Sequence, residues 1–147
     1  MKKYLKITLI IWLLSLTAGA QVSNLTDKSK NFRSIPEPSE VFFDLENGLK
    51  HGDPSKFSKY LSENSYISLP NGVSGYFSSN QSFYILKDFF KSFDPVNFSF
   101  SQTGGKKDPV ATGGLIYESN GKREHAIVYI TLQYESNFWR VTQLTVN

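Results

Sequence analysis

An amphipathic segment with marked ends, residues 78–93, constrains the fold of this 147-residue chain most strongly. Ser78 and Gln81 have the spacing of a capping box, in which each side chain bonds an unpaired backbone N–H at a helix start. Apolar residues then recur at steps of three and four, which places them on one helical face: Phe83, Leu86, Phe90 and Phe93, widened by Ile85 and Phe89. Asp94-Pro95 ends the helix because the residue before a proline avoids the α region. So wide an aromatic stripe requires a large partner surface.

Two further helices are predicted before this segment. Ser39 is a candidate N-cap for a helix that ends at Gly52. Its apolar side is formed by Val41, Phe42, Leu45 and Leu49. Asp53 is then expected to cap a short helix with Pro54 at its first position, the place that proline favours. The apolar contacts of this short helix are Phe57, Tyr60 and Leu61.

The remaining segments predict β-strands. Residues 66–69 form a short strand followed by a loop at 70–75, and longer strands are expected around 98–100 and at 110–118, 124–134 and 138–146. Asn120-Gly121 is a strong signal for a two-residue hairpin turn. The even positions of the third long strand are all apolar and predict a core face: Ala126, Val128, Ile130 and Leu132. Helices collected on one face of an antiparallel sheet indicate an α+β domain.

The first twenty residues predict a cleavable signal peptide (1–20). Three lysines precede an apolar run at 7–16, and Ala18 and Ala20 supply the small residues of a cleavage site. The run is shorter than the roughly 20 residues that span a bilayer, which argues against an uncleaved anchor. Residues 21–37 are polar and are expected to be a flexible linker to a single domain at 38–147. We therefore expect an exported protein, periplasmic or secreted, that is soluble after cleavage near Ala20.

Removing the signal peptide changes the charge balance. The full chain has 16 Lys and Arg against 13 Asp and Glu, a formal net charge of +3, and three of the lysines lie in residues 1–20. The remainder is formally neutral, so charge gives no reason to expect binding to nucleic acid or to a membrane surface. The chain has no cysteine, which excludes disulfides, a thiol nucleophile and thiolate metal sites.

The order of these motifs resembles the nuclear-transport-factor-2-like, or cystatin-like, cone. It is more closely similar to a family of small exported bacterial domains of this fold without an assigned function. The matching pieces, spread over residues 38–146, are Gly52-Asp53, Leu69-Pro70, the Tyr76-x-Ser78-x-x-Gln81 approach to 85–90, Asn120-Gly121 and 139–144. The resemblance implies three helices on a curved antiparallel sheet, with a conical pocket between them. It implies no substrate, because the same cone carries isomerases, dehydratases and non-enzymatic domains.

An enzyme of this kind needs a carboxylate or histidine in the pocket and a donor for the developing oxyanion. Glu124 shares the parity of the core residues and, with Glu63, is an acid to test as a catalytic group. His51 adjoins the helix end at Gly52, where an imidazole can bond free carbonyls. His125 lies on the odd face of its strand, which favours a surface or subunit contact. Two histidines so placed give no indication of a metal site, and no cofactor is expected.

Aromatic side chains are abundant, with 12 Phe, 8 Tyr and 2 Trp. Five of them are candidate ligand-binding residues that could hold a flat apolar or sugar-like molecule: Tyr66, Tyr76, Tyr84, Tyr117 and Trp139. The alternative, which we favour, is that they are core and subunit-contact residues, because an apolar stripe is most often part of the core.

Three functional hypotheses follow. The favoured one is a non-enzymatic exported domain that binds a small ligand or a partner protein through its cone or outer sheet face. The second is a cofactor-independent isomerase or dehydratase with a carboxylate in the cone. The third is a structural module whose outer face, with Ile127 and Tyr129 exposed beside Trp139 or Val141, forms a symmetric homodimer. A one-residue shift of the last strand would replace Trp139 by Phe138 in the core.

Overall fold

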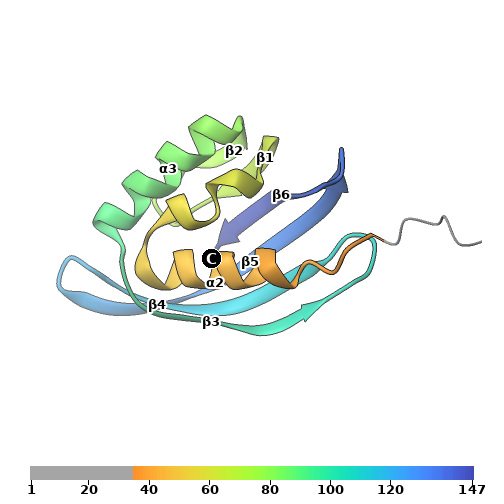
Figure 1. Cartoon of the computed structure of the whole chain (residues 1–147). Coiled ribbons are helices and arrows are strands. Elements are labelled where there is room, and N and C mark those ends of the chain that lie inside the picture. The colour runs from red at the N-terminus through yellow and green to blue at the C-terminus, as the bar shows by residue number, and fades with distance from the viewer. Residues whose placement is uncertain (1–34) are drawn as a thin grey trace, which may run out of the picture. The chain divides into compact units, whose positions relative to one another are not determined.

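Six strands and two α-helices form the part of the chain that the structure, a computed structural model, describes: residues 35–147. The predicted signal peptide and residues 21–34 of the predicted linker lie outside the described residues. The elements, in chain order, are α2 (Ser39–His51), the 3-10 turns η1 (Pro54–Lys56) and η2 (Ser58–Tyr60), β1 (Leu61–Ser68), β2 (Ser74–Phe77), α3 (Ser79–Ser92), β3 (Asp94–Gly104), β4 (Val110–Ser119), β5 (Lys122–Glu135) and β6 (Phe138–Val146) (Figure 1).

The sheet has the strand order β2-β1-β6-β5-β4-β3. Strands β3 to β6 form the predicted antiparallel meander, and β1 and β2 pair antiparallel at the other end. β1 pairs with β6 in parallel, however, so the prediction of a purely antiparallel sheet is wrong. A parallel neighbour needs a long connection, and here the whole chain from β2 to β5 lies between the two strands. Both helices lie on one side of the sheet, which curves around them (Figure 1).

The aromatic helix forms as predicted. The Ser78 hydroxyl accepts a hydrogen bond from the Gln81 backbone N–H at 3.3 Å, and the Gln81 side-chain oxygen accepts one from the Ser78 N–H at 3.0 Å. Leu86, Phe89 and Phe90 are buried against the sheet. The capping box thus fixes where α3 begins and directs its apolar face inward.

The start of the domain needs two corrections. Ser39 is the first residue of α2 and not its N-cap. The N-cap is Pro38, which makes no side-chain hydrogen bond to the helix. The short helix predicted after Asp53 does begin at Pro54, but residues 54–60 form two 3-10 turns and not a third α-helix. The Asp53 carboxylate does accept the Ser55 N–H at 3.1 Å, as its capping role requires. The segment turns too tightly for an α-helix because Phe57 is fully buried and β1 already begins at Leu61.

The inward faces of the strands agree with the predicted parity. Ala126, Val128, Ile130 and Leu132 of β5 are all buried. On β6, Trp139 is 6% exposed whereas Phe138 is 62% exposed, so Trp139 is the core residue. Trp139 and Val141 therefore both point inward. The dimer hypothesis placed one of them beside Ile127 and Tyr129 on the outer face, and this part of it is wrong.

Candidate functional site

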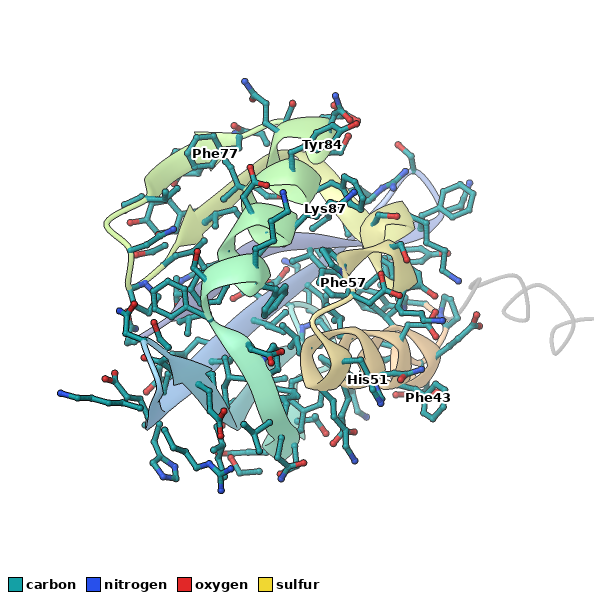
Figure 2. The ribbon with its side chains drawn as sticks, turned by 90° about the vertical axis from the view of Figure 1, so that its left-hand side faces the viewer. Phe43, His51, Phe57, Phe77, Tyr84 and Lys87 are labelled. Carbon is teal, nitrogen blue, oxygen red and sulfur yellow. The ribbon has the colours of Figure 1, made fainter. Side chains whose placement is uncertain are left out.

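The space between the helices and the sheet is filled by apolar side chains. Phe57, Phe89 and Phe98 are at most 1% exposed, and Figure 2 shows Phe57 between the two helices. The buried polar side chains of residues 35–147 are Ser62, Ser65, Ser82 and Thr145. No carboxylate or imidazole of the described part of the chain is buried in this interior.

The two candidate catalytic acids lie at the surface. Glu124 is opposite Tyr117 in the β4–β5 register, and the buried Tyr117 hydroxyl donates to its carboxylate at 3.2 Å. Burial raises the pKa of Tyr117, and the hydrogen bond and charge of Glu124 raise it further. Glu124 itself is exposed, close to the hairpin turn. Glu63 is exposed on β1 and accepts a hydrogen bond from the Ser79 hydroxyl at 2.7 Å.

Three of the five candidate ligand-binding aromatics are tyrosines with accessible rings. Tyr66 and Tyr76 lie opposite each other on β1 and β2, with ring centroids 5.2 Å apart. Tyr76 is 68% exposed, whereas Tyr66 is half-buried. Tyr84 is exposed on α3, on the helical side of the molecule (Figure 2). The structure brings Tyr66 and Tyr76 together and leaves Tyr84 apart from them.

The other two candidates are core residues. Tyr117 packs against Phe93, with ring centroids 5.4 Å apart. Trp139 packs against Tyr134 at 5.1 Å, and its indole N–H donates to the Pro36 carbonyl at 2.9 Å. These contacts place both rings in the interior, where each also satisfies its polar atom. The five aromatics do not converge on a single pocket.

The histidines take the positions that the sequence indicated. His51 Nδ1 lies 2.8 Å from the Asn47 carbonyl oxygen and closes the last turn of α2. His125 is exposed on the outer face of β5. Within residues 35–147, no three His, Asp or Glu side chains gather closely enough to hold a metal ion.

Three polar side chains, Asp44, Lys59 and Tyr60, connect α2 to η2. The Asp44 carboxylate accepts the Tyr60 hydroxyl at 3.0 Å and lies 3.1 Å from the Lys59 amine. The hydrogen bonds of Lys59 with Tyr60 and Asp44 raise the pKa of this lysine, and burial raises the pKa of Tyr60. Perturbed groups of this kind can mark a functional site, but these three bond one another across two packed elements. Their contacts are sufficient to explain them as a structural junction.

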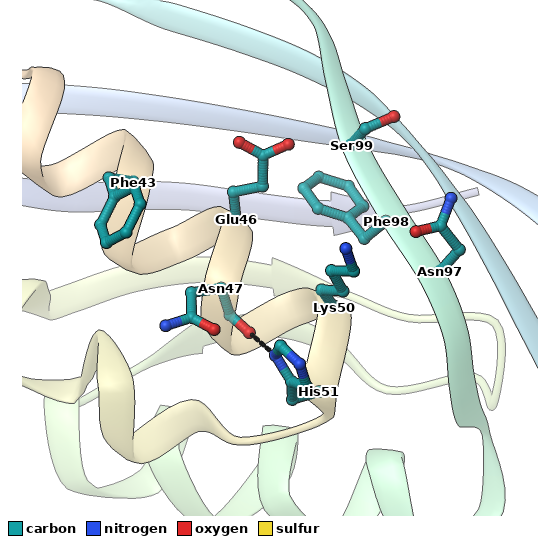
Figure 3. Close-up of a pocket in the computed structure, with 8 residues that line it drawn as sticks. All are labelled: Phe43, Glu46, Asn47, Lys50, His51, Asn97, Phe98 and Ser99. Atoms are coloured by element: carbon teal, nitrogen blue, oxygen red, sulfur yellow. Dashed lines mark hydrogen bonds between the residues drawn. The ribbon is translucent and has the colours of Figure 1, made fainter.

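An open groove of about 360 Å³ separates α2 from the edge strand β3 (Figure 3). It is lined by Phe43, Glu46, Asn47, Lys50, His51, Asn97, Phe98 and Ser99. The Glu46 carboxylate accepts the Phe100 N–H at 3.3 Å and so satisfies part of the exposed strand edge. No sequence pattern marks this groove, because its two walls are about fifty residues apart in the chain.

The outer sheet face, the side turned away from both helices, carries a run of uncharged side chains. On β5 the outward residues from 125 to 131 are His125, Ile127, Tyr129 and Thr131, and on β4 Thr112, Gly114 and Ile116 lie beside them. Ile127 is 51% exposed and Tyr129 is 40% exposed. These two residues were singled out from sequence, and both are on the face where they were expected.

A depression of about 550 Å³ lies in this face over Gly114. A Cβ atom built on Gly114 has no other heavy atom within 4 Å. The lining residues are Asn97, Ser99, Gly114, Leu115, Ile116, His125, Ala126, Ile127 and Asn147. This depression was not predicted from the sequence, although the outward parity of Gly114 beside two isoleucines was a usable signal.

A family model described as a domain of unknown function, DUF4783, matches residues 42–147. The chain belongs to the DUF4783 family. A crystal structure of a DUF4783 family protein from Bacteroides uniformis ATCC 8492 is 15% identical, with a TM-score of 0.65 over 71% of this chain and 94% of that one. A second, from Bacteroides fragilis YCH46, is 18% identical, with a TM-score of 0.61 over 70% and 93%.

The fold of this DUF4783 chain is also similar to that of a wider group. An NTF-2 like protein of unknown function from Shewanella oneidensis MR-1 is 10% identical, with a TM-score of 0.54 over 74% of this chain and 93% of that one. The DUF4783 chain therefore has an α+β NTF2-like fold, and its residues 35–147 place two α-helices on a mixed six-stranded sheet. No match was found among curated proteins. The family description names no activity, and none of the helices in residues 35–147 is long and apolar enough to cross a membrane.

Proposed function

We propose that this DUF4783 protein is a non-enzymatic binding domain that associates with a second copy of itself through the outer face of β4 and β5. The observation that carries the proposal is the Gly114 depression, which no acid, lysine or arginine side chain lines and where half-exposed Ile127 lies beside Ile116. Exposed apolar residues grouped around a hollow are typical of protein interfaces, whereas single exposed ones are ordinary.

Self-association is favoured because the surface has both a projection and a hollow. Gly114 pairs with Ile127 across β4 and β5, and Tyr129 lies on the neighbouring row opposite Thr112. The Tyr129 ring of one copy can enter the Gly114 depression of the other, and a two-fold axis repeats the same contact. These rows carry no charged side chains, so two identical copies can approach each other here without like-charge repulsion.

The positions of the acids support a non-enzymatic role. Glu124 and Glu63, the carboxylates of the alternative enzyme hypothesis, are exposed and already accept hydrogen bonds from Tyr117 and Ser79. Neither lines the α2–β3 groove or the outer-face depression. A catalytic carboxylate is expected in a closed site, whereas Glu63 and Glu124 are both exposed.

Export remains part of the proposal. Its support is the sequence of residues 1–20, with three lysines, an apolar run and a small-residue cleavage site. Mass spectrometry of the protein recovered from the periplasm or medium should give an N-terminus at Gln21. Recovery of the uncleaved chain from the cytoplasm would contradict this part of the proposal.

The oligomeric state tests the interface. Light scattering over a concentration series should give a dimer for the wild type and a monomer for Ile127→Lys and Tyr129→Lys. Phe43→Lys is the matched control, because Phe43 is 67% exposed on α2, away from this face, and this variant should remain a dimer. Gly114→Val fills the depression where the structure has room for a side chain, so it should fold normally and dimerise about tenfold more weakly. A wild type that is monomeric at every concentration would overturn the proposal.

A further inference from the structure

We propose that the other half of the outer sheet face, across β2, β1 and β6, binds a neutral polysaccharide. This inference goes beyond self-association, which uses β4 and β5. Its starting point is the pair Tyr66 and Tyr76, whose rings meet edge to face at 5.2 Å with an interplanar angle of 63°. Tyr76 is 68% exposed, so one of the two rings is largely open to a ligand.

The tyrosine pair is held in a fixed arrangement. Tyr66 and Tyr76 are directly opposite in the β1–β2 register, and the Tyr66 hydroxyl shares a hydrogen bond of 3.0 Å with the Ser74 hydroxyl. Ile67, between Tyr66 and Ser68, is fully buried, which directs its two neighbours to the outer face. A surface ring that is already ordered loses little conformational entropy when it binds.

Uncharged polar side chains continue from the tyrosines across the sheet. One row runs from Tyr76 and Tyr66 to Gln143 on β6 and Thr131 on β5. The next row contains Ser74 and Ser68 and ends at the buried Thr145 on β6, beside Tyr129 of the proposed self-association surface. Neither row contains an acid, a lysine or an arginine, and the rows cross four strands that are spaced about 4.8 Å apart. Together they form a continuous surface of aromatic rings, hydroxyls and one amide on the outer side of the sheet.

This combination matches the chemistry of a neutral sugar polymer. The C–H faces of sugar rings pack on aromatic rings, and their hydroxyls bond hydroxyl and amide side chains. A nucleic acid or an acidic polymer would need lysines or arginines, which these rows lack. The rows described here are richer in hydroxyls than in aliphatic groups. They are therefore less suited to contact a second copy of the protein than the aliphatic side chains around Gly114.

Affinity electrophoresis of the purified full chain in gels containing β-glucan, xylan, mannan or glycogen tests the proposal. At least one of these neutral polymers should retard the protein, and Tyr76→Ala should weaken that binding about tenfold. Tyr84→Ala is the matched control, since it removes an exposed tyrosine from α3 on the helical side of the domain. Tyr66 is half-buried, so a milder change is needed at this position. Tyr66→Phe removes only the hydroxyl that is hydrogen-bonded to Ser74, and it should reduce binding without unfolding the domain.

Three results would overturn the proposal: no retardation by any of the neutral polymers, equal losses with Tyr76→Ala and Tyr84→Ala, or binding only to the anionic control polygalacturonate. The test is separate from that of self-association. Ile127→Lys should become monomeric yet keep its polysaccharide binding, whereas Tyr76→Ala should bind the polysaccharide about tenfold more weakly yet remain a dimer. Each proposal can therefore fail while the other stands.

Discussion

The ring of Phe57 occupies the space that Gly48 leaves open on α2. A Cβ atom built on Gly48 would lie 2.7 Å from Phe57 Cε1 and 2.9 Å from the Asp53 carbonyl oxygen, both closer than real contacts allow. Phe57 is fully buried between the helices, so the ring has nowhere to move. This glycine in the last turn of α2 is therefore a packing requirement.

Gly48→Ala should lower the free energy of unfolding by about 1–2 kcal/mol. Overpacking a core costs about 1–3 kcal/mol, and the better helix propensity of alanine returns at most about 1 kcal/mol. Urea denaturation followed by circular dichroism measures the change. Gly104→Ala is the control, because a Cβ there has no neighbour within 4 Å and the variant should stay within about 0.5 kcal/mol of wild type. A Gly48→Ala protein as stable as wild type would show that Phe57 can repack.

The start of α3 gives a second prediction. Ser78→Ala removes the hydroxyl that accepts the Gln81 N–H, and the loss of such an N-cap costs about 1 kcal/mol. Ser78→Asp should keep most of the stability, because aspartate also caps and its charge suits the helix dipole. Thermal denaturation of the two variants beside wild type measures the difference. Equal melting temperatures for Ser78→Ala and wild type would mean that packing alone fixes the start of α3.

Local signals explain which elements could be predicted from the sequence. The capping box at Ser78 and the stop at Asp94-Pro95 act within a few residues, and so does the Asn120-Gly121 turn, whose residues have φ of 52° and 72°. β5 alternates cleanly because one face is buried and the other is exposed. In each of these cases, the pattern and the structural constraint lie in the same short segment.

The missed features depend on residues far apart in the chain. The first half of β1, which begins at Leu61, is rich in serine and other polar residues and shows no alternation of apolar and polar residues. Ser65 is nevertheless buried there, and its hydroxyl donates to the Val141 carbonyl at 2.7 Å. Gly113 and Gly114 look alike in sequence. In the structure the Phe98 ring lies over Gly113, whereas Gly114 opens the depression on the other face. Strand parity places the two glycines on opposite faces, but only the neighbouring strands show which one is covered and which is open.

The Trp139 indole gives a third prediction, because it donates to the Pro36 carbonyl just before α2. A chain that begins at Glu37 lacks this acceptor and should be about 1 kcal/mol less stable than one that begins at Ile35. Its fluorescence should shift to longer wavelength as the ring, now 6% exposed, gains contact with water. Trp139 is the only tryptophan in either chain, so the signal has a single source. Identical spectra and stabilities for the two chains would contradict the importance of this contact.

The Tyr117–Glu124 pair predicts how stability changes at high pH. The folded state raises the pKa of Tyr117 above its unfolded value of about 10, so folding favours the protonated hydroxyl. The stability from this group is complete below about pH 10 and is lost as the pH rises through the folded pKa. Tyr117→Phe has no proton to lose, and should therefore lose less stability than wild type between about pH 9 and 11. Its lower stability at neutral pH, by about 1 kcal/mol, reflects the missing hydrogen bond.

Glu124→Gln separates the two causes of this shift. The amide can still accept the Tyr117 hydrogen bond but carries no charge, so only burial and a weaker bond keep the pKa of Tyr117 raised. The alkaline loss of stability should therefore be largest for wild type, intermediate for Glu124→Gln and smallest for Tyr117→Phe. Urea denaturation at a series of pH values measures this order. Three parallel curves would mean that other groups cause the alkaline unfolding and that the Glu124 contact has no part in it.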